Sequence, residues 1–194
     1  MNVDDLNKLI RERRSVFPKD YTGEKVDDSL IRQLLENANW APTHKLIEPW
    51  RFKVFCGDGL KRFAELQASE YHKKCFGTEK FLEKKHHKLL NSPLKCSHII
   101  SIGMHREEDA ILPEMEDIAA VSCAVQNILL SIHAYGLGGY WSTGGVTYIE
   151  STKPFFDLAE EDVLLGFIYL GVIDCIPEPG KRQPIDSKVS WCRA

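Results

Sequence analysis

The chain has 194 residues, of which 43% are hydrophobic and 27% are charged, and its formal net charge is −3. This composition is typical of a globular protein and excludes a disordered or fibrous chain. The 28 acidic residues slightly outnumber the 25 Lys and Arg, so the overall charge gives no reason to expect binding to nucleic acid or to an anionic membrane.

The N-terminal half is predicted to consist of helices around one strand. Helical spacing of Leu and Ile predicts an amphipathic helix over residues 3–15 and a second over 28–39. A loop over 40–49 follows, and residues 50–55 alternate apolar and basic side chains as a half-buried strand does. Residues 59–91 are helical in pattern and rich in Lys and His, and we expect two helices there.

The C-terminal half adds three predicted strands and the longest helix. A β-branched run over 97–102 predicts a strand, and an acidic stretch over 107–117 leads into a helix over 118–134. Nearly every side chain of that helix is apolar or small, so it belongs to the core or to a subunit interface. Short and long strands are predicted over 140–143 and 163–170, the second buried on both faces.

Strands separated by helices predict one domain, residues 1–194, with an α+β or α/β sheet of four or five strands flanked by helices. The tail over 177–191 holds three prolines and is expected to be an extended arm. No run approaches the ~20 apolar residues of a membrane span, and the first residues are acidic, unlike a signal peptide. We therefore expect a cytoplasmic protein without a membrane partner.

The cysteines are scattered and contain no Cys-x-x-Cys pair, which favours reduced thiols over a disulfide framework. A metal protein is an alternative, but its nearest His and Cys groupings lack a recognisable zinc spacing. Those groupings are His86-His87, His72-x-x-Cys75 and Cys96-x-His98. We expect no metal site.

Four segments hold polar groups that amphipathic patterning does not explain. Arg13-Arg14-Ser15 could bind a phosphate through charge-assisted hydrogen bonds, or its cations could merely complement a helix dipole. The loop with Trp40 and His44 could cover a planar ligand, or its indoles could fill the core.

The third segment, residues 138–145, contains four glycines that could bring backbone amides close to a ligand, although a plain tight turn has the same composition. The fourth, residues 180–184, places Lys and Arg beside a proline, and a solvated basic loop is its alternative.

In this order, the four segments resemble those of the nitroreductase family of FMN-dependent oxidoreductases, and in particular its small, minimal members. The likeness covers nearly the whole chain: Arg-Arg-Ser, Ala-Pro-Thr-His-Lys-Leu-Ile-Glu-Pro-Trp, the long small-residue helix, Gly-Leu-Gly-Gly-Tyr-Trp-Ser-Thr-Gly-Gly and Gly-Phe-Ile-Tyr-Leu-Gly. The resemblance implies an α+β homodimer with a mostly antiparallel sheet and one FMN at each of two sites shared by both subunits.

The resemblance also implies roles for single residues. Arg13, Arg14 and Ser15 would hold the phosphate and ribityl chain, with Arg182 as a further cation. The cofactor would also be bordered by residues of both subunits: Trp40 and His44 from the other subunit, and Trp141, Ser142 and Thr143 by backbone and side-chain contacts. No catalytic side chain is expected, because the flavin carries the chemistry.

The implied reaction is a ping-pong transfer in which NAD(P)H gives a hydride to flavin N5 and a nitroaromatic, quinone or related acceptor then takes the electrons. The sequence departs from the commoner family pattern at Phe17, Leu46 and Glu48. Phe17 removes a cation that could stabilise the reduced flavin, which keeps open a flavin-binding carrier or sensor without efficient turnover as the alternative.

Two expectations about single residues follow from the resemblance. Ala124→Arg in the long helix should break the dimer and lower flavin content together. Glu48 should not contact the flavin ring as a free carboxylate, because a negative charge there would oppose the anionic reduced form.

Overall fold

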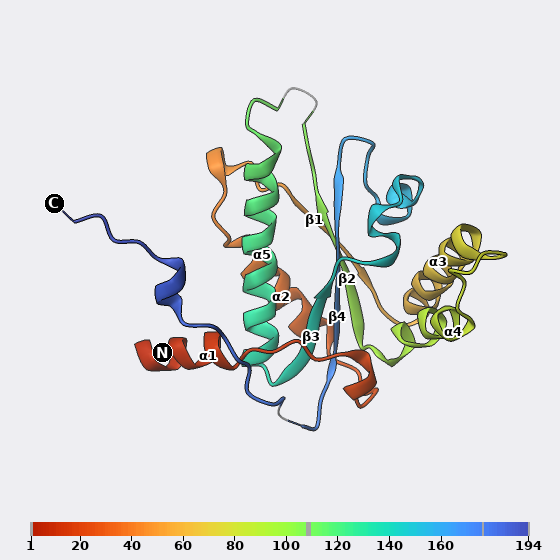
Figure 1. The fold of residues 1–194 in the computed structure, drawn as a ribbon, viewed down its shortest axis with the longest axis horizontal. Helices are drawn as coiled ribbons and strands as arrows, with labels where there is room; N and C mark the ends of the chain where they lie inside the picture. Colours follow the sequence, from red (N-terminus) through yellow and green to blue (C-terminus); the bar gives the residue numbers. More distant parts are fainter. Residues whose placement is uncertain (1, 108–109, 176, 194) are drawn as a thin grey trace.

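Four strands form one antiparallel sheet with helices on both faces (Figure 1). The computed structural model describes residues 2–107, 110–175 and 177–193. The strand order is β1-β2-β4-β3, so β1 and β3 are the two edges. The strands are β1 (Trp50–Phe55), β2 (His98–Met104), β3 (Leu137–Ser142) and β4 (Val163–Val172). The predicted α+β fold with four or five strands is confirmed.

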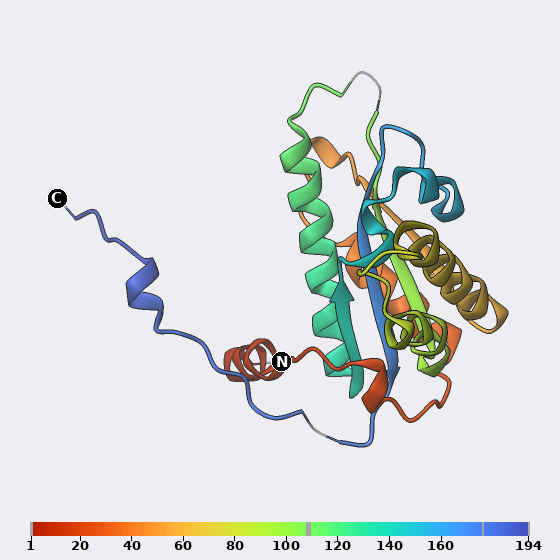
Figure 2. The ribbon, with the colours of Figure 1, turned by 45° about the vertical axis from the view of Figure 1, so that its right-hand side comes forward.

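The helices divide between the two faces of the sheet, as Figure 2 shows. On one face, α2 and α5 cover a core that includes Ile100, Ile102 and Ile168. On the other face, the side of the sheet that carries Ile99 and Phe167 packs under α3. The helices are α1 (Val3–Glu12), α2 (Asp28–Asn39), α3 (Asp58–Cys75), α4 (Glu83–Asn91) and α5 (Glu114–Ala134).

The first helix ends three residues before its predicted end near Ser15. Asn2 and Asp5 form a capping box that starts α1, but Arg13 already has an extended backbone, with φ −54° and ψ 128°. The chain then runs along the edge strand β3, where the Val16 amide donates to the Gly139 carbonyl at 3.1 Å. Residues 13–16 therefore run beside the sheet edge and do not continue the helix.

Strand β3 begins three residues before the predicted strand over 140–143, because it includes two glycines that the sequence pattern assigned to a turn. A Cβ atom on Gly138 would lie 2.5 Å from the Ile173 side chain and 3.0 Å from the Tyr21 ring. Only glycine leaves room for this packing, so here the residue marks a close approach within a strand.

Helix α5 is long and apolar enough, by length and composition, to cross a membrane, contrary to the expectation of no such run. In this fold one side of it is a core element, and Val121, Ala124 and Ile128 are fully buried against α2 and the sheet. The opposite side, including Ala119 and Cys123, is exposed in the single chain. Helix α5 is thus only half covered.

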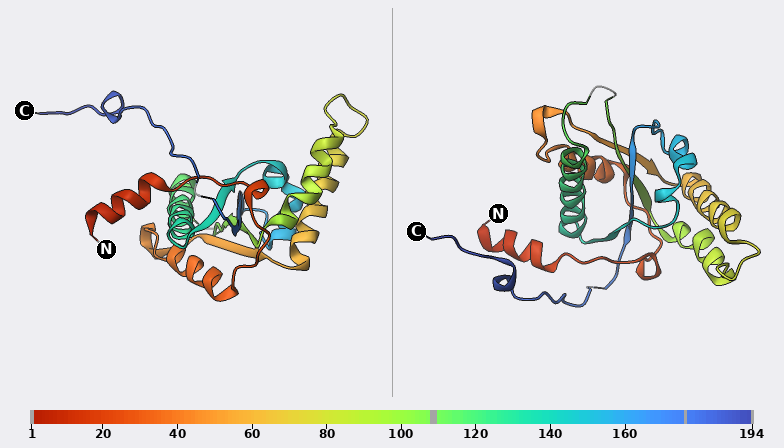
Figure 3. Two further views of the ribbon diagram at one scale, coloured as in Figure 1. Left: turned by 90° about the horizontal axis from the view of Figure 1, so that it is seen from below. Right: turned by 45° about the horizontal axis from the view of Figure 1, so that its top comes forward.

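Both ends of the chain lead away from the sheet (Figure 3). No residue of α1 is buried, and residues 178–193 of the tail are exposed. Apart from one short 3₁₀ turn, Ile185–Lys188, residues 177–193 are extended, which agrees with the predicted arm. We call residues 177–193 the C-terminal arm.

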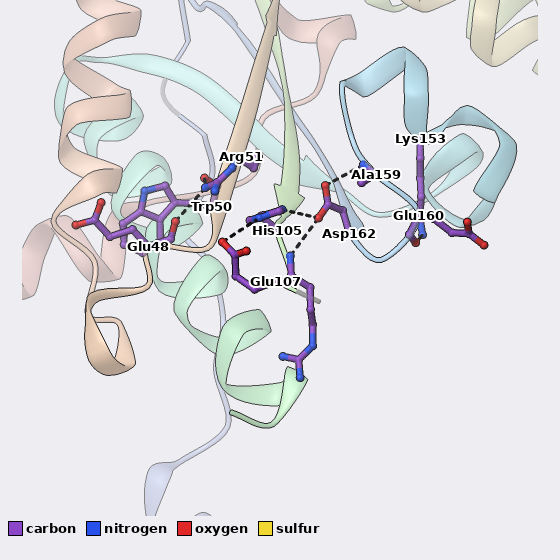
Figure 4. Close-up of polar contacts among 10 residues, drawn as sticks. Glu48, Trp50, Arg51, His105, Glu107, Lys153, Ala159, Glu160 and Asp162 are labelled. Atoms are coloured by element: carbon purple, nitrogen blue, oxygen red, sulfur yellow. Dashed lines mark hydrogen bonds and ion pairs between the residues drawn. The ribbon is translucent and has the colours of Figure 1, made fainter. Parts of the chain in front are cut away.

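A buried aspartate, Asp162, connects the loop that precedes β4 to the residues that follow β2 (Figure 4). Asp162 accepts hydrogen bonds from the amides of Ala159 and Arg106 at 2.9 and 3.1 Å, and its Oδ1 lies 2.8 Å from Nδ1 of His105. Burial alone would raise the pKa of Asp162, but these hydrogen bonds and the nearby imidazole outweigh burial and lower it.

Asp162→Asn is expected to lower the free energy of unfolding by about 1–3 kcal/mol near pH 7, because the amide cannot accept all three hydrogen bonds. A carboxylate with a depressed pKa stabilises the fold above its unfolded pKa, about 3.9, and loses that effect as the pH falls through the folded pKa. Urea unfolding at pH 7 and pH 3 should therefore show a difference between wild type and variant that shrinks in acid. Glu160→Gln, at an exposed neighbour, is the control, and an equal gap at both pH values would contradict this role.

Candidate flavin site at the β3 edge

Three of the four segments singled out in the sequence meet along strand β3. The Val16–Gly139 hydrogen bond holds the Arg13–Ser15 segment beside β3, which ends at Ser142. The C-terminal arm passes the same place, since a Cβ atom on Gly180 would lie 2.5 Å from Arg14 Nε. These contacts bring the two arginines, the glycine-rich segment and the C-terminal arm together, although the three segments are far apart in the sequence.

The arginines form a cluster in which, among the described residues, Arg13 and Arg14 make no ion pair with an acid. Burial, and then the charges of Arg14 and Arg182, lower the pKa of Arg13. Arg14 Nη1 donates to the Arg13 carbonyl at 2.6 Å, but Arg14 Nε is buried and has no hydrogen-bond partner in the described part of the chain. Leaving such a donor unpaired is costly. The cluster is suited to an anion with several acceptor oxygens, such as a phosphate.

A cavity of about 550 Å³ opens farther along the same strand. The distance from Gly139 to Ser142 is three residues, or roughly 10 Å of strand. Ser142 and the glycines that follow β3 line one wall, and α3 and α4 line the other. The lining residues that matter below are Tyr140, Ser142, Gly144, Gly145, Lys85 and Lys88.

Two phenols form the inner wall of this cavity. The rings of Tyr140 and Tyr169 stack at 5.0 Å between centroids, and Gln67 Nε2 donates to the Tyr169 hydroxyl at 3.2 Å. Burial raises the pKa of Tyr140 to about 12 and that of Tyr169 further. Both phenols are neutral near pH 7. The Tyr169 hydroxyl is engaged by Gln67, whereas the Tyr140 hydroxyl can donate to a ligand in the cavity. The sequence analysis missed Tyr140, although it shares the strand face of Ser142 at a spacing of two residues.

The side chains on either side of Ser142 do not line the cavity. The Trp141 indole packs against the α5 core and donates to the Leu165 carbonyl at 2.9 Å. Thr143 is exposed. Of the three predicted residues, Ser142 lines the cavity, whereas the Trp141 side chain serves the core.

His44 lies near the start of α5, whereas Trp40 lies beside Asn127 and Ser131 farther along that helix. His44 Nδ1 is 2.6 Å from a Glu116 carboxylate oxygen at the start of α5. Near the end of α5, burial lowers the pKa of His133, and the nearby charges of Arg13 and Arg14 lower it further. Seventeen helical residues span about 25 Å. Trp40 is 80% exposed, so the core-filling interpretation fails for it. One chain alone does not bring His44 to the arginine cluster.

The core-filling interpretation does hold for the second indole of this loop. Trp50 is buried in the α5 core, and its Nε1 donates to Asn39 Oδ1 at 2.9 Å.

The three departures from the family pattern are also placed. Phe17 lies against Tyr140, with ring centroids 4.7 Å apart. Leu46 and Glu48 are exposed and, with Lys45, have positive φ angles near 50°, a conformation that costs non-glycine residues energy. This strained loop is an outlier of the kind that clusters at functional sites.

The chain is similar to known proteins over most of its length. Residues 10–172 match the family model described as "Nitroreductase family". The Escherichia coli (strain K12) protein named "Putative NAD(P)H nitroreductase YdjA" is 31% identical over 172 residues, which cover 87% of this chain and 88% of that protein.

Solved structures show the same fold. The nitroreductase-like family protein from Bacillus cereus superposes with a TM-score of 0.83 at 28% identity, covering 100% of this chain and 99% of that one. The FMN-dependent nitroreductase NfnB from Mycobacterium smegmatis, solved in complex with NADPH, has a TM-score of 0.73 at 16% identity, covering 98% and 99%. The family match and the sequence identity together lead to one conclusion: the chain belongs to the nitroreductase family.

Proposed function

We propose that this protein is a cytoplasmic, homodimeric, FMN-dependent oxidoreductase that transfers a hydride from NAD(P)H through flavin N5 to a nitroaromatic, quinone or related acceptor by a ping-pong mechanism. The observation that carries the proposal is the buried, unpartnered Arg14 Nε within the cluster of Arg13, Arg14 and Arg182. The terminal phosphate of FMN, a phosphate monoester, supplies the acceptor oxygens that this cluster needs.

The chain's own residues suit the two ends of FMN. Arg13, Arg14, Ser15 and Arg182 would hold the phosphate and ribityl chain. Ser142, with the backbone of Gly144 and Gly145, would border the ring roughly 10 Å along the strand. When bound, FMN supplies the hydride chemistry, while the protein orients it and sets its electrostatic surroundings.

The cavity contains positive charge that could replace the cation missing at Phe17. Lys85 and Lys88 line the same cavity as Ser142, and Glu70 on its wall pairs with Lys73 at 2.6 Å. The cavity wall therefore keeps an excess of cations although Phe17 supplies none. Such charge favours the negative charge that builds up on reduction, which supports turnover over a mere carrier role.

A second copy of the chain would complete the site. His44 lies about 25 Å along α5 from the arginines, so we infer that it borders the flavin of another subunit. The exposed side of α5 and the projecting C-terminal arm offer surfaces for this pairing. Both features support the homodimer.

The visible spectrum of purified protein tests the proposal. We expect a stoichiometric flavin band that bleaches when NADPH or NADH is added without oxygen, and that returns when a quinone or nitroaromatic is supplied. A protein that binds FMN but is not reduced by either nucleotide would support the carrier or sensor alternative. A protein that binds no FMN would overturn both.

Glu48→Gln is expected to change the flavin reduction potential by less than about 15 mV, or ~0.7 kcal/mol for a two-electron couple. Glu48 is exposed, and its main chain, through an amide donating to Thr43 Oγ1 at 3.2 Å, holds it in the strained loop. Potentiometric titration of the two holoproteins measures the effect. Glu24→Gln, at an exposed acid before α2, is the matched control. A rise well beyond that of the control would show that the Glu48 charge acts on the ring.

A further inference from the structure

Three side chains with metal-binding donors converge at the β1 edge, the edge opposite β3. They are Asp28 from the first turn of α2, Cys56 directly after β1, and His98 at the start of β2. One carboxylate oxygen, the sulfur and an imidazole nitrogen all lie within 4.8 Å of one another. We propose that Asp28, Cys56 and His98 bind a divalent ion of the Zn²⁺ type.

The donor spacing suits tetrahedral coordination. His98 Nε2 lies 3.1 Å from Asp28 Oδ1. With metal–ligand bonds of 2.0–2.3 Å, tetrahedral donors are about 3.4–3.6 Å apart. All three donors already lie within 4.8 Å of one another. Asp28 and Cys56 are exposed and can adjust around an ion, whereas His98 is 3% exposed.

The register of the sheet explains why these residues meet. Phe55 pairs with Ile99 in the β1–β2 ladder, so Cys56 and His98 each lie one residue beyond that pair. Asp28 comes from α2, distant in sequence from both. The sequence analysis expected no metal site because it considered donors close in sequence, such as Cys96 and His98. Cys96 is fully buried in the other core and does not belong to the cluster.

A neighbouring hydrogen bond orients the imidazole. His98 Nδ1 lies 2.9 Å from the hydroxyl of Ser97, and that hydroxyl accepts from the Val26 amide at 2.7 Å. Without an ion, Nε2 donates to the Asp28 carboxylate and Nδ1 accepts from the Ser97 hydroxyl. An ion between Nε2 and Asp28 would take the Nε2 lone pair, and the ring proton would move to Nδ1 and be donated to Ser97. Metal-binding histidines characteristically have such a second partner.

The donor set selects the kind of metal. Thiolate and imidazole favour Zn²⁺ and related transition ions over Mg²⁺ or Ca²⁺, which prefer oxygen ligands. Three protein ligands leave a fourth position for water. On binding, the Cys56 thiol releases its proton to solvent and the sulfur bonds the ion as thiolate.

The test uses untagged full-length protein, with Zn²⁺ measured by calorimetry and Co²⁺ by absorbance. We expect one ion per chain and a thiolate-to-cobalt charge-transfer band. Asp28→Asn and Cys56→Ser, both at exposed positions, should weaken Zn²⁺ binding by roughly 10- to 100-fold or more, and Cys56→Ser should abolish the band. Cys175→Ser, at another exposed cysteine, should change neither.

Ser97→Ala provides a second check, with an expected loss of roughly 10-fold in affinity through the freed imidazole. The proposal is overturned if Cys56→Ser binds Zn²⁺ as wild type does, or if Co²⁺ binds without a thiolate band. Because these readouts need no flavin, they stand apart from the test of the proposed enzyme activity.

Discussion

Replacing Arg13 or Arg182 with alanine is expected to weaken FMN binding by roughly 10- to 150-fold and to leave riboflavin binding almost unchanged. Each guanidinium would make charge-assisted hydrogen bonds to the phosphate, worth about 1.5–3 kcal/mol. Riboflavin lacks the phosphate and so loses nothing. Arg14→Ala should behave likewise, since its Nε is the buried donor without a partner. Titration of each flavin by fluorescence measures the losses.

Arg11→Ala is the matched control for these variants. Arg11 lies in the last turn of α1 and is exposed, so it complements the helix dipole without being part of the arginine cluster. It should leave the affinity for both flavins unchanged. Equal losses of FMN and riboflavin in the Arg13 and Arg182 variants would mean that these residues support folding, and would remove them from the phosphate site.

Cys123→Arg is expected to convert the protein to a flavin-poor monomer that keeps its helical content. Cys123 is on the exposed side of α5, where the proposed second copy would pack, and a charge there would be buried on assembly at a cost of several kcal/mol. Sedimentation, circular dichroism and flavin content measure the three effects. Glu79→Arg, in an exposed loop beyond α3, controls for the added charge, and a flavin-loaded dimer of Cys123→Arg would contradict the interface.

Ala124→Arg is expected to have a different effect from the one that the sequence analysis assigned to it. Ala124 is fully buried against the sheet within one chain, so a guanidinium there should destabilise the fold itself by more than about 4 kcal/mol. Loss of helical content and of cooperative unfolding is the expected result. Neighbouring positions on α5 thus distinguish folding from assembly.

Local signals explain which elements the sequence predicted well. Helix α2 and strand β1 match their predicted bounds because Asp27 caps the helix and alternating side chains mark the strand. Strand β3 was predicted too short because its glycines serve packing against Tyr21 and Ile173, contacts that depend on tertiary structure. The exposed side of α5 could not be predicted either. The apolar pattern indicates that the helix is buried, but it does not tell whether the same chain or a second chain covers it.

For the site, too, residues with a local sequence signal could be predicted, and residues brought in by tertiary structure could not. Arg13, Arg14 and Ser15 could be singled out because cations are concentrated in three consecutive residues. Their closeness to Arg182 could be expected only from the family resemblance, because Arg182 comes 167 positions after Ser15. The lysines of α4 meet Tyr169 of β4 at the cavity only because α4 packs against α3, which no local pattern encodes.

The separation of about 25 Å along α5 between the arginine cluster and His44 has a thermodynamic consequence. If each flavin touches two subunits, flavin binding and subunit association are linked equilibria, and each must strengthen the other by the same factor. Diluting the protein would then release cofactor, and excess FMN would hold subunits together at concentrations where the flavin-free chains separate. Cofactor supply would thereby set the balance between monomer and dimer.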